Sequence, residues 1–324
     1  MRTSDEATTR PELLILLPTT LEEDPALPPG VRGVRYDPAE RLPDGVLDAD
    51  VLVAWGNGRR QLRDAAARLR RVRWVASLAA GPDTVLEAGF APDVVVTSGR
   101  GLHDGPVAEH ALALVLAVVR RVPDLVRAQQ DHRWAGELGG IQPLHDPQVR
   151  TLAGARVLVW GFGSIAARLA PLLAALGAQV TGVARTAGVR HGFPVVAQDE
   201  VAVELARTDV LVCLLPQTPA THHLVDAAVL AALPPRAWVV NVGRGSTLDE
   251  SALLAAVRSG AIAGAALDVV EREPLDPASP LWDEPRVLVS PHAAGGRPVG
   301  AAALLERNVA ALLAGRSLEN VVER

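Results

Sequence analysis

Short runs of apolar residues alternate with longer segments in which apolar and polar residues recur at helical spacing. In the first hundred residues, the apolar runs predict buried strands at 13–18, 51–56, 73–79 and 94–99. A second series comprises RVLVWG (156–161), AQVTGVA (178–184), a weaker FPVVA (193–197), DVLVCLLP (209–216), AWVVNVG (237–243), GAALDVV (264–270) and RVLVSP (286–291). Strands that alternate with helical segments are typical of βαβ units around a parallel sheet. The pattern therefore predicts an α/β fold with doubly wound parallel sheets.

The segments between these runs predict helices and one irregular stretch. Helices are expected at about 60–71 and 106–120, whereas residues 130–152, rich in Gly, Pro, His and Asp, predict an irregular arm. A last helix ends at Gly315 and is too short to form a domain, so we expect it to pack on the first domain. The 324 residues are therefore predicted to form two α/β domains, of which the first is discontinuous.

The composition limits the classes of function. Hydrophobic residues make up 49% of the chain but aromatic residues only 3%, so the cores are expected to consist of Ala, Val and Leu. All 32 basic residues are arginine, which excludes Schiff-base lysine chemistry and a P-loop lysine. The net charge of −5 argues against general affinity for nucleic acid or anionic membranes. We interpret the basic run at 59–73 as a solvated helix face.

Neither export nor membrane insertion is indicated by the sequence. The first ten residues, MRTSDEATTR, lack the apolar core of a signal peptide. The longest apolar run, Ala111 to Val119, has nine residues, whereas a bilayer span needs ~20. The single cysteine, Cys213, cannot form an intrachain disulfide and is expected to be a small buried hydrophobe. These features predict a soluble, cytoplasmic protein.

The segment VLVWGFGSIA predicts a nucleotide-binding turn between a strand and a helix. Gly161, Gly163 and Ala166 occupy the three small positions of the dinucleotide fingerprint. The helix N-terminus would face the pyrophosphate, and Pro171 predicts a kink inside this helix. The apolar residues on its predicted inner face are Ile165, Leu169, Leu172, Leu173 and Leu176. The predicted cofactor-binding residues here are Gly161, Phe162, Gly163, Ser164 and Ile165.

The residues after the next strand bear on the choice between NAD and NADP. An NAD site usually carries an acidic residue at that point, for the ribose hydroxyls. This chain has Ala184 there, followed by Arg185, Thr186 and then Arg190. An arginine can pair with the 2′-phosphate of NADP, whereas an acid would repel it. We predict Arg185 and Thr186 as cofactor-binding residues, with NADP(H) favoured and NAD(H) possible; alternatively, Arg185 only stacks on adenine or lies in solvent.

Three residues in the last third of the chain combine the groups needed to reduce a keto acid. Arg244, in NVGRG, offers a planar, permanently charged fork that can bind a carboxylate. His292, in VSPHAAGG, can donate a proton near neutral pH, and Pro291 fixes the turn before it. Glu273 could hold the ring of His292 and raise its pKa, and Glu271 competes for that role.

The other histidines predict no metal site, because their spacing gives neither an H-x-x-x-H nor a Cys-paired motif. The adjacent His222 and His223 would point in different directions on a regular helix or strand. Trp55 follows the second predicted strand and could line a substrate pocket, because ligands gather at the carboxyl ends of parallel strands. A packing role for Trp55 is the alternative.

The chain resembles the D-isomer-specific 2-hydroxyacid dehydrogenase family from about Trp74 to Gly295. The motifs that carry the resemblance are WVASLAAGPDTVL, PVAEHALALVLAVVRR, VLVWGFGSIA, DVLVCLLPQTPATHHLV, NVGRG, ALDVVEREPL and SPHAAG. The segment SLAAGPD looks more like the glyoxylate/hydroxypyruvate reductase branch than phosphoglycerate dehydrogenase, whose G-x-D-N pattern is absent. Glu273 departs from the formate dehydrogenase branch, which has glutamine at that point.

The resemblance implies roles for the residues that match these motifs. It implies Arg244 as the substrate-binding and catalytic arginine, His292 as the acid/base and Glu273 as its carboxylate partner. It places Asp268 near the nicotinamide amide. Its further cofactor-lining residues are Pro216 and Thr221, to which we add Leu215, Val242 and Gly295. The loop Leu78–Gly81 matches the one whose backbone holds the substrate carboxylate, and the predicted substrate-binding residues are Trp55, Ala79, Ala80, Gly81 and Arg244.

Together, the residues and the resemblance predict an NAD(P)H-dependent reductase of small 2-keto acids, of the glyoxylate or hydroxypyruvate type, with a D-2-hydroxy acid as product. We expect a substrate-binding domain at 1–100 plus 293–324 and an NAD(P)-binding Rossmann domain with a dimerisation arm at 101–292. The active site is expected in the cleft between these domains.

A homodimer is expected, because residues 130–152 and the apolar helix 107–119 offer surface that a monomer would struggle to cover. Two alternative functions stay open. One is a dehydrogenase of another 2-hydroxy acid, including phosphorylated ones. The other is a nucleotide-sensing, co-repressor-like binding protein on the same fold.

Overall fold

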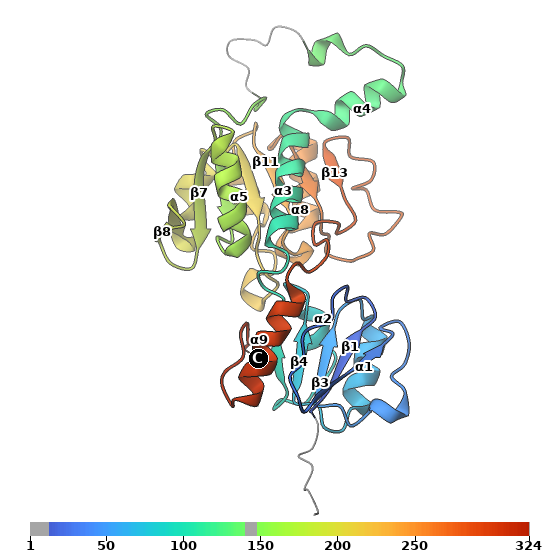
Figure 1. The fold of residues 1–324 in the computed structure, drawn as a ribbon. Helices are drawn as coiled ribbons and strands as arrows, with labels where there is room; N and C mark the ends of the chain where they lie inside the picture. Colours follow the sequence, from blue (N-terminus) through green and yellow to red (C-terminus); the bar gives the residue numbers. More distant parts are fainter. Residues whose placement is uncertain (1–12, 140–147, 324) are drawn as a thin grey trace, which may run out of the picture. The chain divides into compact units, whose positions relative to one another are not determined.

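A computed structural model of the protein describes residues 13–139 and 148–323. The described residues up to His103 and from Arg297 onward form one compact unit, unit 1. Those from Asp104 to Gly296 form a second, unit 2. Each unit is a sheet of mainly parallel strands with helices packed on both faces (Figure 1), which confirms the predicted α/β class with two doubly wound domains.

The sheet of unit 1 has five parallel strands in the order β2-β1-β3-β4-β5. The strands are β1 (Leu13–Pro18), β2 (Val31–Tyr36), β3 (Val51–Ala54), β4 (Trp74–Ser77) and β5 (Val95–Thr97). The helices are α1 (Arg59–Arg68), α2 (Asp83–Leu86) and α9 (Ala301–Leu313). Alternate strand residues face α1 and α2 on one side and α9 on the other. Strand β2 was not predicted, because it is an edge strand with only Tyr36 fully buried.

The sheet of unit 2 has the order β13-β12-β11-β10-β6-β7-β9-β8, parallel except for the β8–β9 pair. Its strands are β6 (Arg156–Trp160), β7 (Gln179–Ala184), β8 (Gly188–Arg190), β9 (Phe193–Ala197), β10 (Val210–Cys213), β11 (Trp238–Asn241), β12 (Gly264–Leu267) and β13 (Val287–Val289). The chain order reverses between β6 and β10, which is where ligands bind in open α/β sheets.

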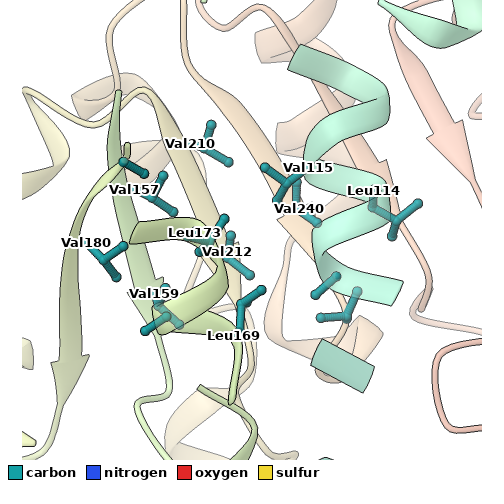
Figure 2. Packing of buried hydrophobic residues seen from close by; sticks show 14 of the residues in the cluster. Leu114, Val115, Val157, Val159, Leu169, Leu173, Val180, Val210, Val212 and Val240 are labelled. Carbon is teal, nitrogen blue, oxygen red and sulfur yellow. The ribbon is translucent and has the colours of Figure 1, made fainter. Parts of the chain in front are cut away.

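The helices of unit 2 cover both faces of this sheet. They are α3 (Asp104–Val119), α4 (Val122–Gln130), α5 (Ser164–Ala175), α6 (Val201–Leu205), α7 (Ala227–Ala232) and α8 (Glu250–Ser259). Valines such as Val157 and Val159 pack against α3 and α5 (Figure 2). The intervening Leu158 and Trp160 pack in the second core, which contains α6, α7 and α8. As predicted from the composition, Ala, Val and Leu fill these cores.

Helix α3 is not the exposed apolar surface that the sequence suggested. Its apolar side, from Val107 to Val119, is buried in the core of unit 2 against α5 and the sheet. Exposed apolar side chains lie instead on α4, a helix that was not predicted, at Val122, Leu125 and Val126. Of the predicted irregular arm, residues 140–147 lie outside the described part of the chain.

Helix α5 has a narrower inner face than predicted. Leu169 and Leu173 are fully buried, whereas Leu172 and Leu176 are exposed. The helix continues through Pro171 as one element. Within the described residues, no helix is both long enough and apolar enough to cross a bilayer.

Candidate active site

The predicted site residues of unit 2 follow the carboxyl ends of its strands. Gly161 follows β6, Leu215 comes shortly after β10, and Arg244 comes shortly after β11. Asp268 directly follows β12, and His292 comes shortly after β13. Because the carboxyl ends of parallel strands meet at one edge of a sheet, these residues gather there. We call this edge the carboxyl edge.

The turn after β6 has the shape that a dinucleotide pyrophosphate requires. Gly161 has a φ of +100°, and a Cβ on it would lie 2.6 Å from the carbonyl oxygen of Leu214. Gly163 is the N-cap of α5, and no described atom lies within 4 Å of where its Cβ would be. The backbone beside the helix N-terminus is therefore open to a phosphate, and the residues present fit this part of the cofactor.

Side chains around the turn hold it in place. Ser164 donates a hydrogen bond from its hydroxyl to Asp104 at the start of α3, at 3.0 Å. The ring of Phe162 is buried over Gly182, where a Cβ would lie 2.4 Å from the ring. Phe162 can therefore offer a cofactor only its backbone. Ala166 is fully buried, which allows close packing of α5 on the sheet.

The segment after β7 carries two arginines and no acidic side chain up to Ala197. Arg185 and Thr186 are exposed just after β7, and β8 and β9 form a hairpin directly behind them. Arg190 reaches back across this hairpin and donates from Nη2 to the Thr186 hydroxyl at 2.8 Å and to its carbonyl at 3.1 Å. This arrangement fits a phosphate on the adenosine ribose and offers no carboxylate to bind the free ribose hydroxyls.

The loop after β10 is held between two glycines. Leu215 lies next to Gly243 as well as near Gly161, because a Cβ on Gly243 would lie 2.7 Å from the Leu215 carbonyl oxygen. Thr221 donates from its hydroxyl to the carbonyl of Pro216 at 2.6 Å, which closes the loop. The side chains of Leu215 and Val242 are buried, so they support the carboxyl edge from within the unit.

His292 and Glu273 form a hydrogen-bonded pair. The Nδ1 atom of His292 lies 2.8 Å from Oε2 of Glu273, and both side chains are partly exposed. Glu271, the competing candidate, contacts His223 instead. His292 has a φ of +52°, in the left-handed region, and its backbone N–H donates to the Asp268 carbonyl at 2.7 Å. With Nδ1 engaged by Glu273, Nε2 is the ring nitrogen suited to a substrate.

The pairing shifts both groups toward their charged forms. The hydrogen bond with Glu273 raises the pKa of His292 above its ordinary value, against the partial burial of the ring. The negative charges of Glu273 and Asp268 add to this rise, and the charge of Arg244 opposes it. Burial alone would raise the pKa of Glu273, but the hydrogen bond and charge of His292 outweigh it and leave that pKa lowered. The pair therefore favours imidazolium beside carboxylate.

Arg244 is held by its own loop next to this pair. Its carbonyl accepts hydrogen bonds from the Thr247 hydroxyl at 2.7 Å and the Asn241 amide at 3.2 Å. The next residue, Gly245, packs so closely on the chain that a Cβ would lie 1.9 Å from the carbonyl of Val270. The loop of Arg244 therefore rests directly on the backbone that leads to Glu273.

His222 and His223 do not point in different directions, as they would on a regular element. They follow the 3-10 turn Pro219–Thr221, His223 has a φ of +48°, and the two rings stack with centroids 4.2 Å apart.

Burial raises the pKa of the neighbouring Glu250, and the charge of Glu271 adds to this rise. No cluster of three or more His, Cys, Asp or Glu in the described ranges could hold a metal ion.

Asp268 is buried and surrounded by donors, which sequence reasoning did not foresee. Its carboxylate accepts hydrogen bonds from the Ser290 hydroxyl at 2.6 Å and from the backbone of Ala293 and Ala294 at 2.8 and 3.0 Å. His110, on α3, contacts the same carboxylate. The position of Ser290 directly before Pro291 and His292 was one available signal. His110 lies in the quoted motif PVAEHALALVLAVVRR, but nothing in the sequence linked it to Asp268.

Two of the predicted substrate-binding elements come together within unit 1. Trp55 follows β3, and the Ala79–Gly81 loop follows the neighbouring β4. His103 contacts both elements. The centroid of its ring lies 5.3 Å from that of the Trp55 ring, and its Nε2 lies 2.7 Å from the Leu78 carbonyl oxygen. Gly99 lets this loop pack closely, because a Cβ on it would overlap the Leu78 carbonyl.

Two other features of unit 2 lie apart from this chemistry. A cavity of about 310 Å³ opens where β11, β12 and β13 begin, beside Trp238, Ala265 and Val287, and includes none of the predicted site residues. Cys213 is fully buried, and burial raises the pKa of its thiol to about 12. Its predicted character as a small buried hydrophobe is confirmed.

Comparisons with known proteins agree with this geometry. Residues 112–294 match the profile of the D-isomer specific 2-hydroxyacid dehydrogenase, NAD binding domain. Glyoxylate/hydroxypyruvate reductase A of Salmonella paratyphi B is 34% identical over 270 residues, or 79% of this chain and 81% of that protein.

Two solved structures are similar over almost the whole chain. A D-isomer specific 2-hydroxyacid dehydrogenase from Xanthobacter autotrophicus, in complex with NADPH and MES, is 32% identical with a TM-score of 0.78, covering 97% of this chain and 98% of that one. An NADPH-dependent glyoxylate/hydroxypyruvate reductase from Sinorhizobium meliloti, in complex with NADP and sulfate, is 30% identical with a TM-score of 0.79, covering 96% and 98%.

Proposed function

Because this chain belongs to the D-isomer specific 2-hydroxyacid dehydrogenase family, we propose that it reduces small 2-keto acids with NADPH. Glyoxylate and hydroxypyruvate are the proposed substrate type, and a D-2-hydroxy acid is the product. One observation carries this proposal. The hydrogen-bonded His292–Glu273 pair and the Arg244 loop lie on the same sheet edge as the open glycine turn.

Arg244, His292 and Glu273 have separate roles in the proposed reaction. NADPH, when bound, supplies the hydride that reaches the keto carbon. Arg244 binds the substrate carboxylate with its guanidinium group and orients the carbonyl. His292 donates the proton on Nε2 to the keto oxygen as negative charge develops there. Glu273 accepts the hydrogen bond from Nδ1 and stabilises the imidazolium until that proton leaves.

We assign the cofactor to unit 2 and further substrate contacts to unit 1. In unit 2, Gly161 to Ile165 would face the pyrophosphate, and Arg185 and Thr186 the 2′-phosphate. The remaining assignments on the carboxyl edge are Leu215, Pro216, Thr221, Val242, Asp268 and Gly295. In unit 1, the backbone of Ala79, Ala80 and Gly81 would bind the carboxylate of the substrate, and Trp55 would pack against its body.

A steady-state assay with a panel of 2-keto acids tests the proposed activity. NADPH consumption is followed with glyoxylate, hydroxypyruvate, a bulkier keto acid and a phosphorylated one. We expect glyoxylate or hydroxypyruvate to give the highest kcat/KM. A clear preference for the phosphorylated acid would assign another 2-hydroxy acid. Tight NADPH binding without turnover of any member would overturn the enzymatic proposal in favour of a nucleotide sensor.

The preference for NADPH over NADH depends on the arginines that follow β7 in the chain. Wild type should give a higher kcat/KM with NADPH than with NADH, and Arg185→Ala should lose most of this preference. A hydrogen bond to a charged group contributes ~1.5–3 kcal/mol, so the ratio should fall roughly 10- to 100-fold. Arg207→Ala, on an exposed arginine paired with Glu204, is the matched control. A wild-type preference for NADH would contradict the assignment.

The pH dependence of reduction reports on Glu273. Because Glu273 raises the pKa of His292, the wild-type rate should fall as pH rises through that raised value. In Glu273→Gln the pKa of His292 is no longer raised. The rate of reduction should therefore decline at lower pH than in wild type, with appreciable activity kept in acid. The measurement is the pH profile of kcat/KM. Glu271→Gln, whose native side chain contacts His223 instead, should leave the profile in place.

A homodimer and a cytoplasmic location are also part of this proposal. Exposed apolar side chains at Val122, Leu125 and Val126 on α4, and Trp134 with 96% of its surface exposed, support a partner surface there. A second copy of the chain is the proposed partner. The single buried cysteine fits a reducing compartment.

A further inference from the structure

The loop that carries His292 is built around one buried carboxylate. Asp268 accepts hydrogen bonds from the backbone N–H groups of Ala293 and Ala294 through its side chain, while its own carbonyl accepts from His292. These bonds hold the residues on both sides of the His292 Cα. They keep His292 at a φ of +52°, a conformation that side-chain-bearing residues seldom adopt.

The carboxylate of Asp268 itself needs hydrogen-bond donors, because its side chain is fully shielded from water. A buried carboxylate is costly unless donors surround it. Besides the two backbone groups, Ser290 donates its hydroxyl hydrogen to Oδ1 at 2.6 Å. A second side-chain contact comes from α3, where Nε2 of His110 lies 3.1 Å from the same oxygen.

The geometry assigns a hydrogen to Nε2 of His110. Its Nε2 lies 3.1 Å from both the Asp268 Oδ1 and the Ser290 Oγ. A carboxylate can only accept, and the Ser290 hydrogen is already directed at Asp268. Nε2 of His110 must therefore carry a hydrogen and donate it to this pair of oxygens. His110 thus connects α3 to Asp268 and to Ser290, the residue before Pro291.

We propose that His110 is a positioning residue for His292, which it aligns through Asp268 and Ser290. This inference rests on the proposed function, in which His292 donates the proton to the keto oxygen. His110 has no part in the chemistry itself, since its contacts are to the carboxylate and hydroxyl behind the loop. Its effect reaches His292 through the backbone that Asp268 holds.

The same arrangement sets the charges that surround the His292 ring. Glu273 and Asp268 favour the protonated ring and Arg244 disfavours it. A loosened loop would change the distances of His292 from all three groups. The alignment of the proton with the keto oxygen matters only in the transition state, so its loss should lower kcat and leave KM nearly constant.

The test compares His110→Leu with His110→Gln in the full-length protein. Leucine fills similar volume without a donor, whereas glutamine can place an N–H near the position of Nε2. We expect the single-turnover rate of NADPH oxidation with glyoxylate to fall roughly tenfold in His110→Leu, since small misplacements of a reacting group cost up to ~10²-fold. KM for glyoxylate should stay within about twofold, and His110→Gln should recover most of the rate.

Ser290→Ala provides an independent variant and a coupling test. Both side chains act on the Asp268 Oδ1, so the combined loss in His110→Leu/Ser290→Ala should differ from the product of the single losses. Glu109→Gln, on the exposed neighbour in α3, is the matched control. If His110→Leu does not fold, a rate loss in Ser290→Ala with unchanged KM supports the proposal, and a wild-type rate overturns it.

Two further results would overturn the inference. One is a wild-type rate in a folded His110→Leu protein. The other is an equal rate loss in His110→Leu and His110→Gln, because a donor would then not matter. Failure of the proposed function looks different: either the wild-type protein turns over no keto acid, or His292→Ala keeps the wild-type turnover. If His292→Ala abolishes turnover while His110→Leu behaves like Glu109→Gln, only the role of His110 is wrong.

Discussion

Replacing His292 with alanine should lower kcat for keto acid reduction by roughly 10²–10⁴-fold, the range that general acid catalysis typically supplies. The side chain is partly exposed and lies outside the hydrophobic cores, so the variant should fold with an unchanged melting temperature. NADPH should bind with nearly the wild-type Kd, because the glycine turn follows a different strand. The measurement is kcat with saturating glyoxylate and NADPH, alongside the Kd from NADPH fluorescence.

His132→Ala is the control for this experiment, because His132 is exposed beyond the end of α4 and away from the carboxyl edge. It should retain wild-type kcat. Near wild-type turnover in His292→Ala at saturating substrate would rule out the general-acid role. A wild-type protein that binds NADPH tightly but turns over no keto acid would instead favour a nucleotide-sensing protein.

Replacing Arg244 with alanine should lower kcat and raise KM together, because in the proposed mechanism the same guanidinium group binds the carboxylate and orients the carbonyl. Two hydrogen bonds to a charged group, each of ~1.5–3 kcal/mol, correspond to a loss of roughly 10²–10⁴-fold in kcat/KM. Arg244→Lys should restore only part of this loss, since an ammonium group cannot bind a carboxylate in bidentate fashion. Steady-state kinetics with glyoxylate give both constants.

A substrate without the carboxylate separates binding from a general loss of structure. A simple aldehyde should be a poor substrate for wild type, and Arg244→Ala should turn it over at a similar rate. If the variant instead lost activity on aldehyde and keto acid to the same extent, a specific contact between Arg244 and the carboxylate would be contradicted. Arg207→Ala again serves as the exposed-arginine control.

The elements that the sequence predicted well are those buried on both faces. Strands such as β6 and β10 are continuous apolar runs, and each lies at its predicted place. Strand β2 and the short β8 were missed because edge strands with exposed side chains carry no such signal. The surface assigned to helix α3 was wrong for a related reason: periodicity indicates an apolar helix, but not which neighbour covers it.

Only part of the candidate site could be predicted from the sequence. Motif residues such as Gly161, Arg244 and His292 could be found from the sequence because chemistry restricts them to certain residue types and turns. Their supports could not be found, since His110 lies more than 150 residues from Asp268, and only the packing of α3 on the sheet brings them together. The choice of Glu273 over Glu271 likewise depended on the resemblance rather than on spacing.

The close approach of Gly245 to Val270 bears on how such an enzyme can acquire new substrates. A side chain at position 245 would overlap the Val270 backbone, so main-chain packing holds the loop of Arg244 against the segment that leads to Glu273. Mutations elsewhere can therefore alter which keto acid is accepted without disturbing how it is reduced. Directed evolution for new substrates should find its gains at side chains such as Trp55, and almost none at position 245.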